Sequence, residues 1–191
     1  MLSISNNISN EIIINKSKFI TFLFRVDSLD EINKYIDDLN IEYKDSTHIC
    51  YAYVLDNVKR FSDDGEPGGT AGMPILNVLE NKNLNHILCC VVRYFGGIKL
   101  GAGGLVRAYS NSCSDIIDIA NIIELIPGKL CSISFEYDDT KSIDRLLNDC
   151  EIVSKNYSDN VTYLFKADLD FISSLTYDIK IIEDCYIEKE N

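Results

Sequence analysis

The chain has 191 residues, of which 46% are apolar and 25% charged, and its formal net charge is −12. These proportions are ordinary for a soluble globular protein, and no apolar run approaches the roughly 18 residues of a membrane-spanning helix. A field this negative repels nucleic acid at long range, which excludes strong nonspecific binding and leaves only local or partner-assisted contacts.

Residues 1–11 have neither the basic nor the apolar region of a signal peptide, so we expect a cytoplasmic protein without membrane partners. The seven cysteines are odd in number, scattered and free of any C-x-x-C pair. We therefore expect buried structural thiols instead of a zinc site or a disulfide framework.

The first part of the chain predicts an α/β domain. Ser28 is a typical N-cap, Pro74 suits the first turn of a short helix, and the run at 87–94 is apolar enough for a strand buried on both faces. The expected strands lie at 12–14, 19–26, 48–55 and 87–94, and the expected helices at 28–39, from Pro74 and at 103–120. The last helix has one apolar face, with Arg107 on the other.

Pro127-Gly128 marks a plausible boundary, because the pattern restarts beyond it and glycine disappears. We expect domains at residues 1–126 and 127–191. The second has predicted strands at 130–137, 152–157, 161–167 and 180–187 and helices at 140–149 and 169–175. The order β-α-β-β-α-β is that of a ferredoxin-like fold and gives an α+β class, a scaffold without an implied chemistry.

Nine of the ten glycines lie between Gly65 and Gly104. They form a first glycine segment, Arg60–Gly72 (RFSDDGEPGGTAG), and a second glycine segment, Arg93–Tyr109 (RYFGGIKLGAGGLVRAY). Glycine is unfavourable inside helices and strands, so this clustering predicts backbone with positive φ or close approach of a ligand. Residues 58–108 also carry six cations against four anions, which makes the region mildly cationic in an acidic chain.

The start of the helix in the second glycine segment is a candidate anion site. A glycine-rich turn before a helix presents free N–H groups and the positive end of the helix dipole. Cations beside it favour a bound anion, which could be a phosphate, an RNA backbone or carboxylates from elsewhere in the chain. The candidate anion- or nucleic-acid-binding residues are Arg60, Arg93, Lys99, Gly101, Gly103, Gly104 and Arg107.

Asp63, Asp64 and Glu66 in the first glycine segment have three interpretations. They could pair with Arg93, Lys99 and Arg107, cap backbone N–H groups, or hold Mg²⁺ and act as acid and base. Neither segment matches the dinucleotide fingerprint or the Walker A motif, so an NTPase is not expected and catalytic residues stay unassigned. No cofactor other than Mg²⁺ is suggested.

The remaining candidates are His48, Thr70 and Tyr94. His48 and Cys50 share a strand face about 6.5 Å apart, which suits core packing better than thiolate activation. Arginine adjoins aromatic residues at Phe61, at Tyr94-Phe95 and near Tyr109, a pattern that could clamp single-stranded RNA. Most of these aromatic residues adjoin core elements, so we expect at most one or two of Phe61, Tyr94 and Tyr109 to be exposed.

Three segments together resemble the YigZ/IMPACT family. They are THICYAY (Thr47–Tyr53), RFSDDGEPGGTAGMP (Arg60–Pro74) and VVRYFGGIKLGAGGLVRAY (Val91–Tyr109), and KSKFI (Lys16–Ile20) is similar to the family's opening strand. The resemblance implies an N-terminal domain like the second domain of a small-subunit ribosomal protein. It also implies a C-terminal domain like a C-terminal domain of elongation factor G.

Both implied relatives act on the ribosome, which favours RNA, the ribosome or translation proteins as partners, without DNA specificity. Eukaryotic members are similar to regulators of the amino-acid-starvation kinase pathway but carry an additional N-terminal domain, so that role is not carried over. We expect a translation-associated protein that binds an anion in a glycine-rich cleft. The alternatives are a metal-dependent enzyme for a phosphorylated or nucleotide-like small molecule, and a protein-interaction module of stress-linked translational control.

Overall fold

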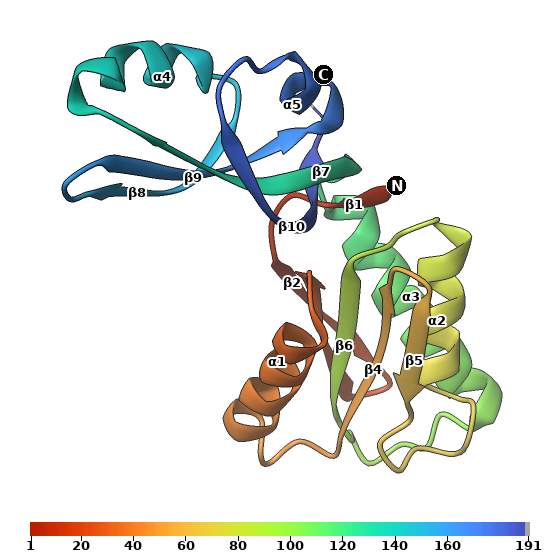
Figure 1. The fold of residues 1–191 in the computed structure, drawn as a ribbon. Coiled ribbons are helices and arrows are strands. Elements are labelled where there is room, and N and C mark those ends of the chain that lie inside the picture. The colour runs from red at the N-terminus through yellow and green to blue at the C-terminus, as the bar shows by residue number, and fades with distance from the viewer. Residues whose placement is uncertain (190–191) are drawn as a thin grey trace. The chain divides into compact units, whose positions relative to one another are not determined.

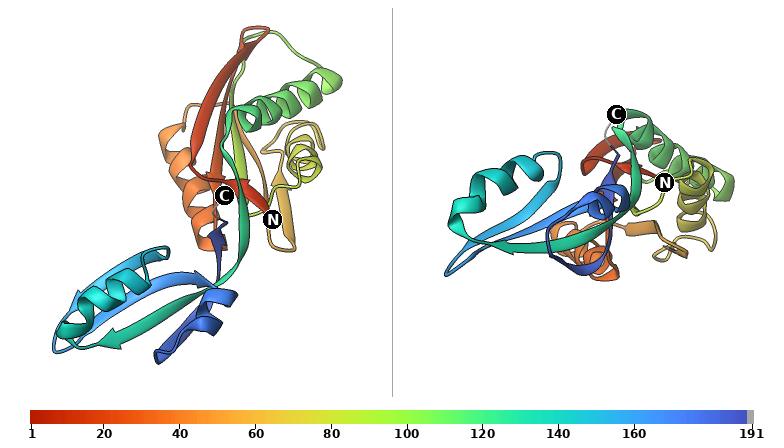
Figure 2. Two further views of the ribbon diagram at one scale, coloured as in Figure 1. Left: turned by 90° about the horizontal axis from the view of Figure 1, so that it is seen from above. Right: turned by 45° about the horizontal axis from the view of Figure 1, so that its top comes forward.

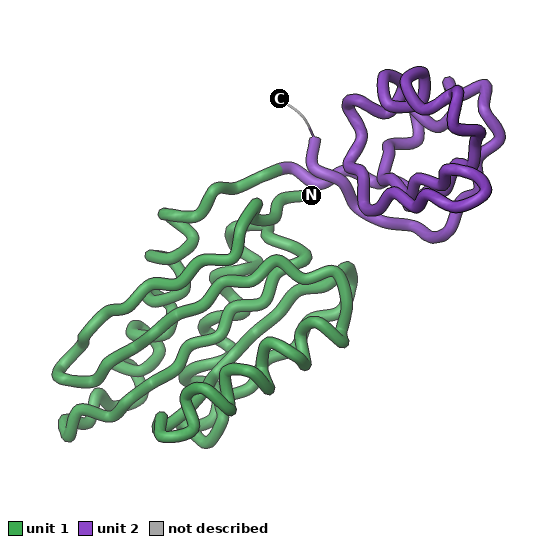
Figure 3. The backbone as a smooth tube through the Cα atoms, turned by 90° about the vertical axis from the view of Figure 1, so that its left-hand side faces the viewer, with its two compact units in different colours: residues 1–123 green, residues 124–191 purple. Residues whose placement is uncertain are grey.

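The computed structural model describes residues 1–189 and divides the chain into two compact units, residues 1–123 and residues 124 onward (Figure 3). The proposed boundary at Pro127-Gly128 is not a turn. Both residues lie inside strand β7 (Ile122–Phe135), where Pro127 pairs with Tyr186 and Gly128 with Cys185 of strand β10 (Ile179–Glu188). Continuous pairing with the neighbouring strand overrides the local turn signal of a Pro-Gly sequence.

Unit 1 is built on a five-stranded antiparallel sheet. Its order is β2 (Ile8–Ile14), β3 (Ser17–Arg25), β6 (Ile87–Tyr94), β4 (His48–Leu55) and β5 (Val58–Ser62). The central strand β6 is buried along nearly its whole length, as its apolar run predicted. A short strand β1 (Leu2–Ile4) precedes the sheet and places Ile4 in the core.

Helices cover both faces of this sheet (Figures 1 and 2). Helix α1 (Leu29–Glu42) packs Ile32 and Leu39 on the face that carries Leu88, Cys90 and Val92. Helices α2 (Gly72–Asn81) and α3 (Ala102–Ile119) pack on the opposite face, which carries Cys89 and Val91. Two-sided burial explains why β6 lacks polar alternation.

Local signals placed the helices of unit 1 well. The Ser28 side chain accepts a hydrogen bond from the Glu31 N–H at 3.2 Å, which confirms the predicted N-cap of α1. In α3, Leu105, Tyr109, Cys113, Ile116 and Ile117 are buried on one face, as expected, whereas Arg107 is exposed. Strand β5 went unpredicted because its side chains are mostly exposed and show no apolar alternation.

Unit 2 has the predicted order β-α-β-β-α-β. After β7 come a 3-10 turn η1 (Tyr137–Asp139), α4 (Thr140–Leu146), β8 (Glu151–Tyr157), β9 (Val161–Asp168), α5 (Leu169–Ser174) and β10. The antiparallel sheet runs β10-β7-β9-β8. Alternate residues of β7 and β9 form its core with Ile143 and Leu147 of the helical face. The likeness to ribosomal-protein and elongation-factor domains stays a prediction.

Among the helices of residues 1–189, none is both long enough and apolar enough to cross a membrane.

Candidate anion-binding site at the glycine segments

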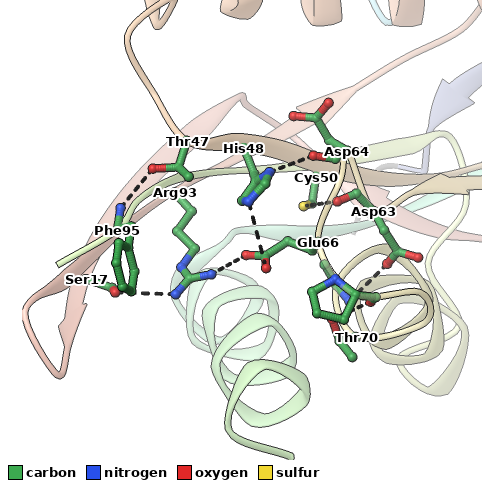
Figure 4. Close-up of polar contacts among 12 residues, drawn as sticks. Ser17, Thr47, His48, Cys50, Asp63, Asp64, Glu66, Thr70, Arg93 and Phe95 are labelled. Atoms are coloured by element: carbon green, nitrogen blue, oxygen red, sulfur yellow. Dashed lines mark hydrogen bonds and ion pairs between the residues drawn. The ribbon is translucent and has the colours of Figure 1, made fainter. Parts of the chain in front are cut away.

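The two glycine segments meet at Glu66. Its side chain is only 3% exposed, and Figure 4 shows Arg93 and His48 directed toward it from β6 and β4. The Arg93 Nη1 donates to Glu66 Oε1, and the Tyr109 hydroxyl donates to the same oxygen at 2.8 Å. One carboxylate of the first glycine segment therefore joins a strand and a helix of the second, and the expected contact between the segments is present.

The Arg93 side chain is buried in this network and is paired with Glu66. It is 5% exposed, and its guanidinium lies 5.5 Å from the centre of the Phe19 ring and 5.7 Å from that of Phe95. Its Nε has no hydrogen-bond partner among the described residues. Of the two alternatives for Arg93, an external anion or a carboxylate from elsewhere in the chain, the structure shows the second, because Glu66 neutralises its charge in a buried position.

Asp63 and Asp64 bind backbone amides. Asp63 Oδ1 accepts from the N–H groups of Ala71 and Gly72 at 3.0 and 2.8 Å, and its Oδ2 accepts from Gly69 at 2.8 Å. Asp64 Oδ2 accepts from the Ile49 N–H at 2.6 Å. Of the interpretations left open, capping thus holds for the two aspartates and ion pairing for Glu66.

No group of three His, Cys, Asp or Glu side chains within residues 1–189 is arranged to hold a metal ion. Asp63 in particular directs both oxygens at the start of α2, where three N–H donors compensate its charge. Binding of Mg²⁺ here stays a prediction, and it would have to displace these amides.

His48 and Cys50 do not form an activated pair. The His48 Nδ1 donates to the Asp64 carbonyl at 2.6 Å, and its Nε2 lies 3.9 Å from Glu66 Oε2. The Cys50 thiol instead lies 3.0 Å from the Asp63 carbonyl and 3.4 Å from the Tyr109 hydroxyl. Burial raises the pKa of Cys50 to about 12, so the thiol is protonated at neutral pH, in line with the expected core role.

Thr70 and Tyr94 serve local structure. Thr70 is buried, and its hydroxyl donates to the Pro67 carbonyl at 2.6 Å, which closes the turn of the first glycine segment. The Tyr94 hydroxyl donates to Asp45 Oδ1 at 3.1 Å, and the Lys18 Nζ lies 5.1 Å from the ring centre. Thr70 thus contacts a residue of its own glycine segment, and Tyr94 contacts Asp45 and Lys18, which lie outside both glycine segments.

The start of α3 keeps the properties that the sequence predicted. Gly101 is the N-cap, with a φ of 71° and no side-chain cap, and Gly103 lies in the exposed first turn. The Arg107 Nη1 reaches back to 3.8 Å from the point where a Cβ on Gly103 would stand. Neither Lys99 nor Arg107, both exposed, forms an ion pair within residues 1–189.

Two other residues that were predicted to bind the anion, Gly104 and Arg60, do not belong to the exposed start of α3. Gly104 is tightly packed, since a Cβ there would stand 3.0 Å from Leu100 Cβ. Arg60 lies exposed on the edge strand β5, and its Nη1 donates to the Lys59 carbonyl at 3.2 Å. The structure therefore reduces the candidate anion site to the backbone of Gly101–Gly103 with Lys99 and Arg107.

Antiparallel pairing adds residues that the motif analysis missed. Lys18 of β3 lies opposite Tyr94 of β6, and the backbone at Lys16 lies so close to Gly96 that a Cβ on Gly96 would overlap it. Lys16 is exposed, whereas Lys18 is half-buried and forms an ion pair with Glu11 at 3.6 Å; both precede Phe95 by almost eighty residues. The sequence analysis had noted the KSKFI stretch that contains both lysines, but only strand pairing shows that it lies beside the second glycine segment.

Comparison with known proteins identifies the family. The model of the Impact N-terminal domain matches residues 15–117, which include both glycine segments. The IMPACT family member YvyE of Bacillus subtilis is 37% identical over 195 residues, covering 94% of this chain and 90% of that protein. The IMPACT family member YigZ of Escherichia coli is 36% identical over 151 residues, covering 75% and 74%.

A solved structure, described as that of a hypothetical protein, aligns with a TM-score of 0.67 and 30% sequence identity. The alignment covers 95% of this chain and 97% of that chain, so it includes both units. The family model, the two bacterial relatives and this two-unit fold agree with the motifs of the glycine segments. The chain belongs to the YigZ/IMPACT family.

Proposed function

We propose that this protein is a translation-associated binding protein that recognises the phosphate backbone of RNA, free or in the ribosome, at the start of α3. One observation carries the proposal. The helix begins at an uncapped Gly101, and two exposed cations, Lys99 and Arg107, stand at that positive helix end without a carboxylate partner among the described residues. The family resemblance supplies translation as the setting.

Electrostatics supports an anionic ligand. The first N–H groups of a helix lack intrahelical acceptors, and the helix dipole adds partial positive charge at the same end. Cations placed there repel this charge, so a bound phosphate would relieve the repulsion and accept several hydrogen bonds. Arg93 does not take part in that contact, because Glu66 holds it.

The overall charge of −12 sets the expected strength of binding. Long-range repulsion from RNA is overcome only near the cations, so affinity should be modest and should fall steeply with salt. Each phosphate contact by a lysine or arginine adds about one unit to the slope of log affinity against log salt. Two cations should therefore account for a slope of about 2.

The test compares wild type with Lys99→Ala/Arg107→Ala in binding to single-stranded RNA and to ribosomes at several salt concentrations. Lys34→Ala/Lys141→Ala is the matched control, since it removes the same charge at exposed positions elsewhere. We expect the first variant to bind more weakly with a shallower salt slope, and the control to behave nearly as wild type. Equal losses in both variants would mean that only net charge matters and would overturn the proposed site.

The rival function, a metal-dependent enzyme for a phosphorylated small molecule, would need the aspartates of the first glycine segment. Asp63 already accepts three backbone hydrogen bonds, and this favours the binding protein over the enzyme. Titration with MgCl₂ distinguishes them. Saturable Mg²⁺ binding that Asp63→Asn removes, together with absence of RNA binding, would support the enzyme instead.

A further inference from the structure

We propose that Phe95 is a stacking platform for a nucleobase of single-stranded RNA, an assignment that rests on the proposed function. Phe95 follows β6 and is 46% exposed, although the large apolar side chain of phenylalanine is normally buried. It belongs to none of the apolar clusters of unit 1. The fold therefore holds a large aromatic ring at the surface, on the segment that leads from β6 to the candidate anion site at Gly101.

The backbone on both sides of the ring is held in place. The Phe95 N–H donates to Thr47 Oγ1 at 3.0 Å, and the Gly96 N–H donates to Ser17 Oγ at 3.1 Å. Gly96 also packs so closely on the Lys16 backbone that no larger residue fits. An aromatic ring on a fixed backbone loses little entropy when a base stacks on it, which raises affinity.

The ring also has a rigid neighbour beneath it. The Arg93 guanidinium lies 5.7 Å from the centre of the Phe95 ring and 5.5 Å from that of the fully buried Phe19. Its hydrogen bond to Glu66, drawn in Figure 4, fixes its orientation. Because Glu66 neutralises the guanidinium, Arg93 contributes a flat, buried support instead of an accessible charge. This gives Arg93 a structural role that agrees with its internal ion pair to Glu66.

Charge favours RNA over a peptide as the occupant. The Lys16 backbone lies beside Gly96, and Lys99 follows Phe95 by four residues. Lys18 instead lies over the Tyr94 ring and forms an ion pair with Glu11 at 3.6 Å. Proteins that bind single strands combine exposed aromatic rings, on which bases stack, with lysine and arginine side chains that meet the phosphates. The other exposed phenylalanine, Phe61, lies on β5 with no cation–π contact among the described residues, so it serves as a control.

The chain contains no tryptophan, which permits a direct optical test. Phe95→Trp places a single tryptophan at the proposed platform, and Phe61→Trp places one at the control position. Each variant is titrated with an oligoadenylate of about eight nucleotides, within the usual range for one binding module, and with an abasic chain of equal length. We expect the oligoadenylate to quench fluorescence of Phe95→Trp only, and the abasic chain to quench neither.

Affinity gives the second readout. Loss of one stacked base typically weakens binding about 5- to 150-fold, so Phe95→Leu should bind the oligoadenylate that much more weakly while Phe61→Leu is unaffected. Binding of the abasic chain should be the same in wild type and Phe95→Leu. Thermal denaturation of each variant verifies that it is folded.

The outcomes separate this proposal from the one on which it rests. If oligoadenylate and abasic chain bind equally well and lose affinity in Lys99→Ala/Arg107→Ala, the anion site stands and the stacking role of Phe95 is wrong. If neither probe binds, both proposals fail. Binding of a polypeptide, but of neither probe, at Phe95 would replace RNA by a protein partner.

Discussion

The two glycine segments are both rich in glycine but use their polar groups in opposite ways. In the first glycine segment, Asp63 and Asp64 accept four backbone hydrogen bonds, and Glu66 is buried against Arg93. In the second, the start of α3 has no side-chain cap, and Lys99 and Arg107 are exposed. One segment satisfies its own backbone, whereas the other leaves donors and cations open.

This difference teaches how glycine clustering should be interpreted. In the first glycine segment, Gly72 has the Ser62 backbone within 3 Å of where a Cβ would stand, so a larger residue would disrupt the start of α2. In the second, nothing lies within 4 Å of a Cβ at Gly97 or Gly101. Glycine thus serves close packing at Gly72, as it does at Gly96 in the second segment. It serves positive φ with open space at Gly97 and Gly101, as it does at Gly69 in the first.

The largest expected effect comes from Glu66→Gln, which removes the charge that holds the segments together. Arg93 would then be buried without a counter-charge, and the free energy of unfolding should fall by about 3–5 kcal/mol, measured by urea denaturation. Glu80→Gln is the control, because Glu80 forms an exposed ion pair with Lys59 at 2.6 Å and should lose less than about 1 kcal/mol. Equal losses would contradict the special role of Glu66.

A smaller loss is expected for Asp63→Ala. Three N–H groups at the start of α2 would lose their acceptor, and we expect a decrease of about 2 kcal/mol in the free energy of unfolding. Asp63→Asn should recover part of it, since the amide oxygen still accepts. Unchanged stability of Asp63→Ala in urea denaturation would mean that the first glycine segment is not maintained by this carboxylate.

The smallest effect separates stability from binding. Gly103 has ordinary helical backbone and no neighbour closer than 3.8 Å to a Cβ, so Gly103→Ala should stabilise the protein by about 0.5–1 kcal/mol. The added methyl would stand over the N–H groups of the α3 start, so RNA affinity should fall. Gly101→Ala, at positive φ, should instead destabilise by about 1 kcal/mol. Unchanged RNA affinity in Gly103→Ala would argue against an anion at this helix end.

Much of the architecture was predictable from local patterns. The cap at Ser28, the apolar face of α3 and the β-α-β-β-α-β order of unit 2 depend on neighbouring residues alone. Strand β5 was missed because it is exposed, and the boundary was placed at Pro127-Gly128 although β7 continues through both residues in its pairing with β10. Both failures involve partners that lie far away in the sequence.

The features of the candidate site also fall into two kinds, those that local sequence predicted and those that depend on contacts between distant residues. By itself, the sequence located the glycine segments, the family and the cations at the start of α3, since these depend on composition and short spacings. Tertiary structure alone decided that Arg93 is neutralised by Glu66, that Asp63 caps α2, and that Lys16 lies beside Gly96. Charge pairing and strand register are set by three-dimensional contacts, which the order of residues specifies only through the complete fold.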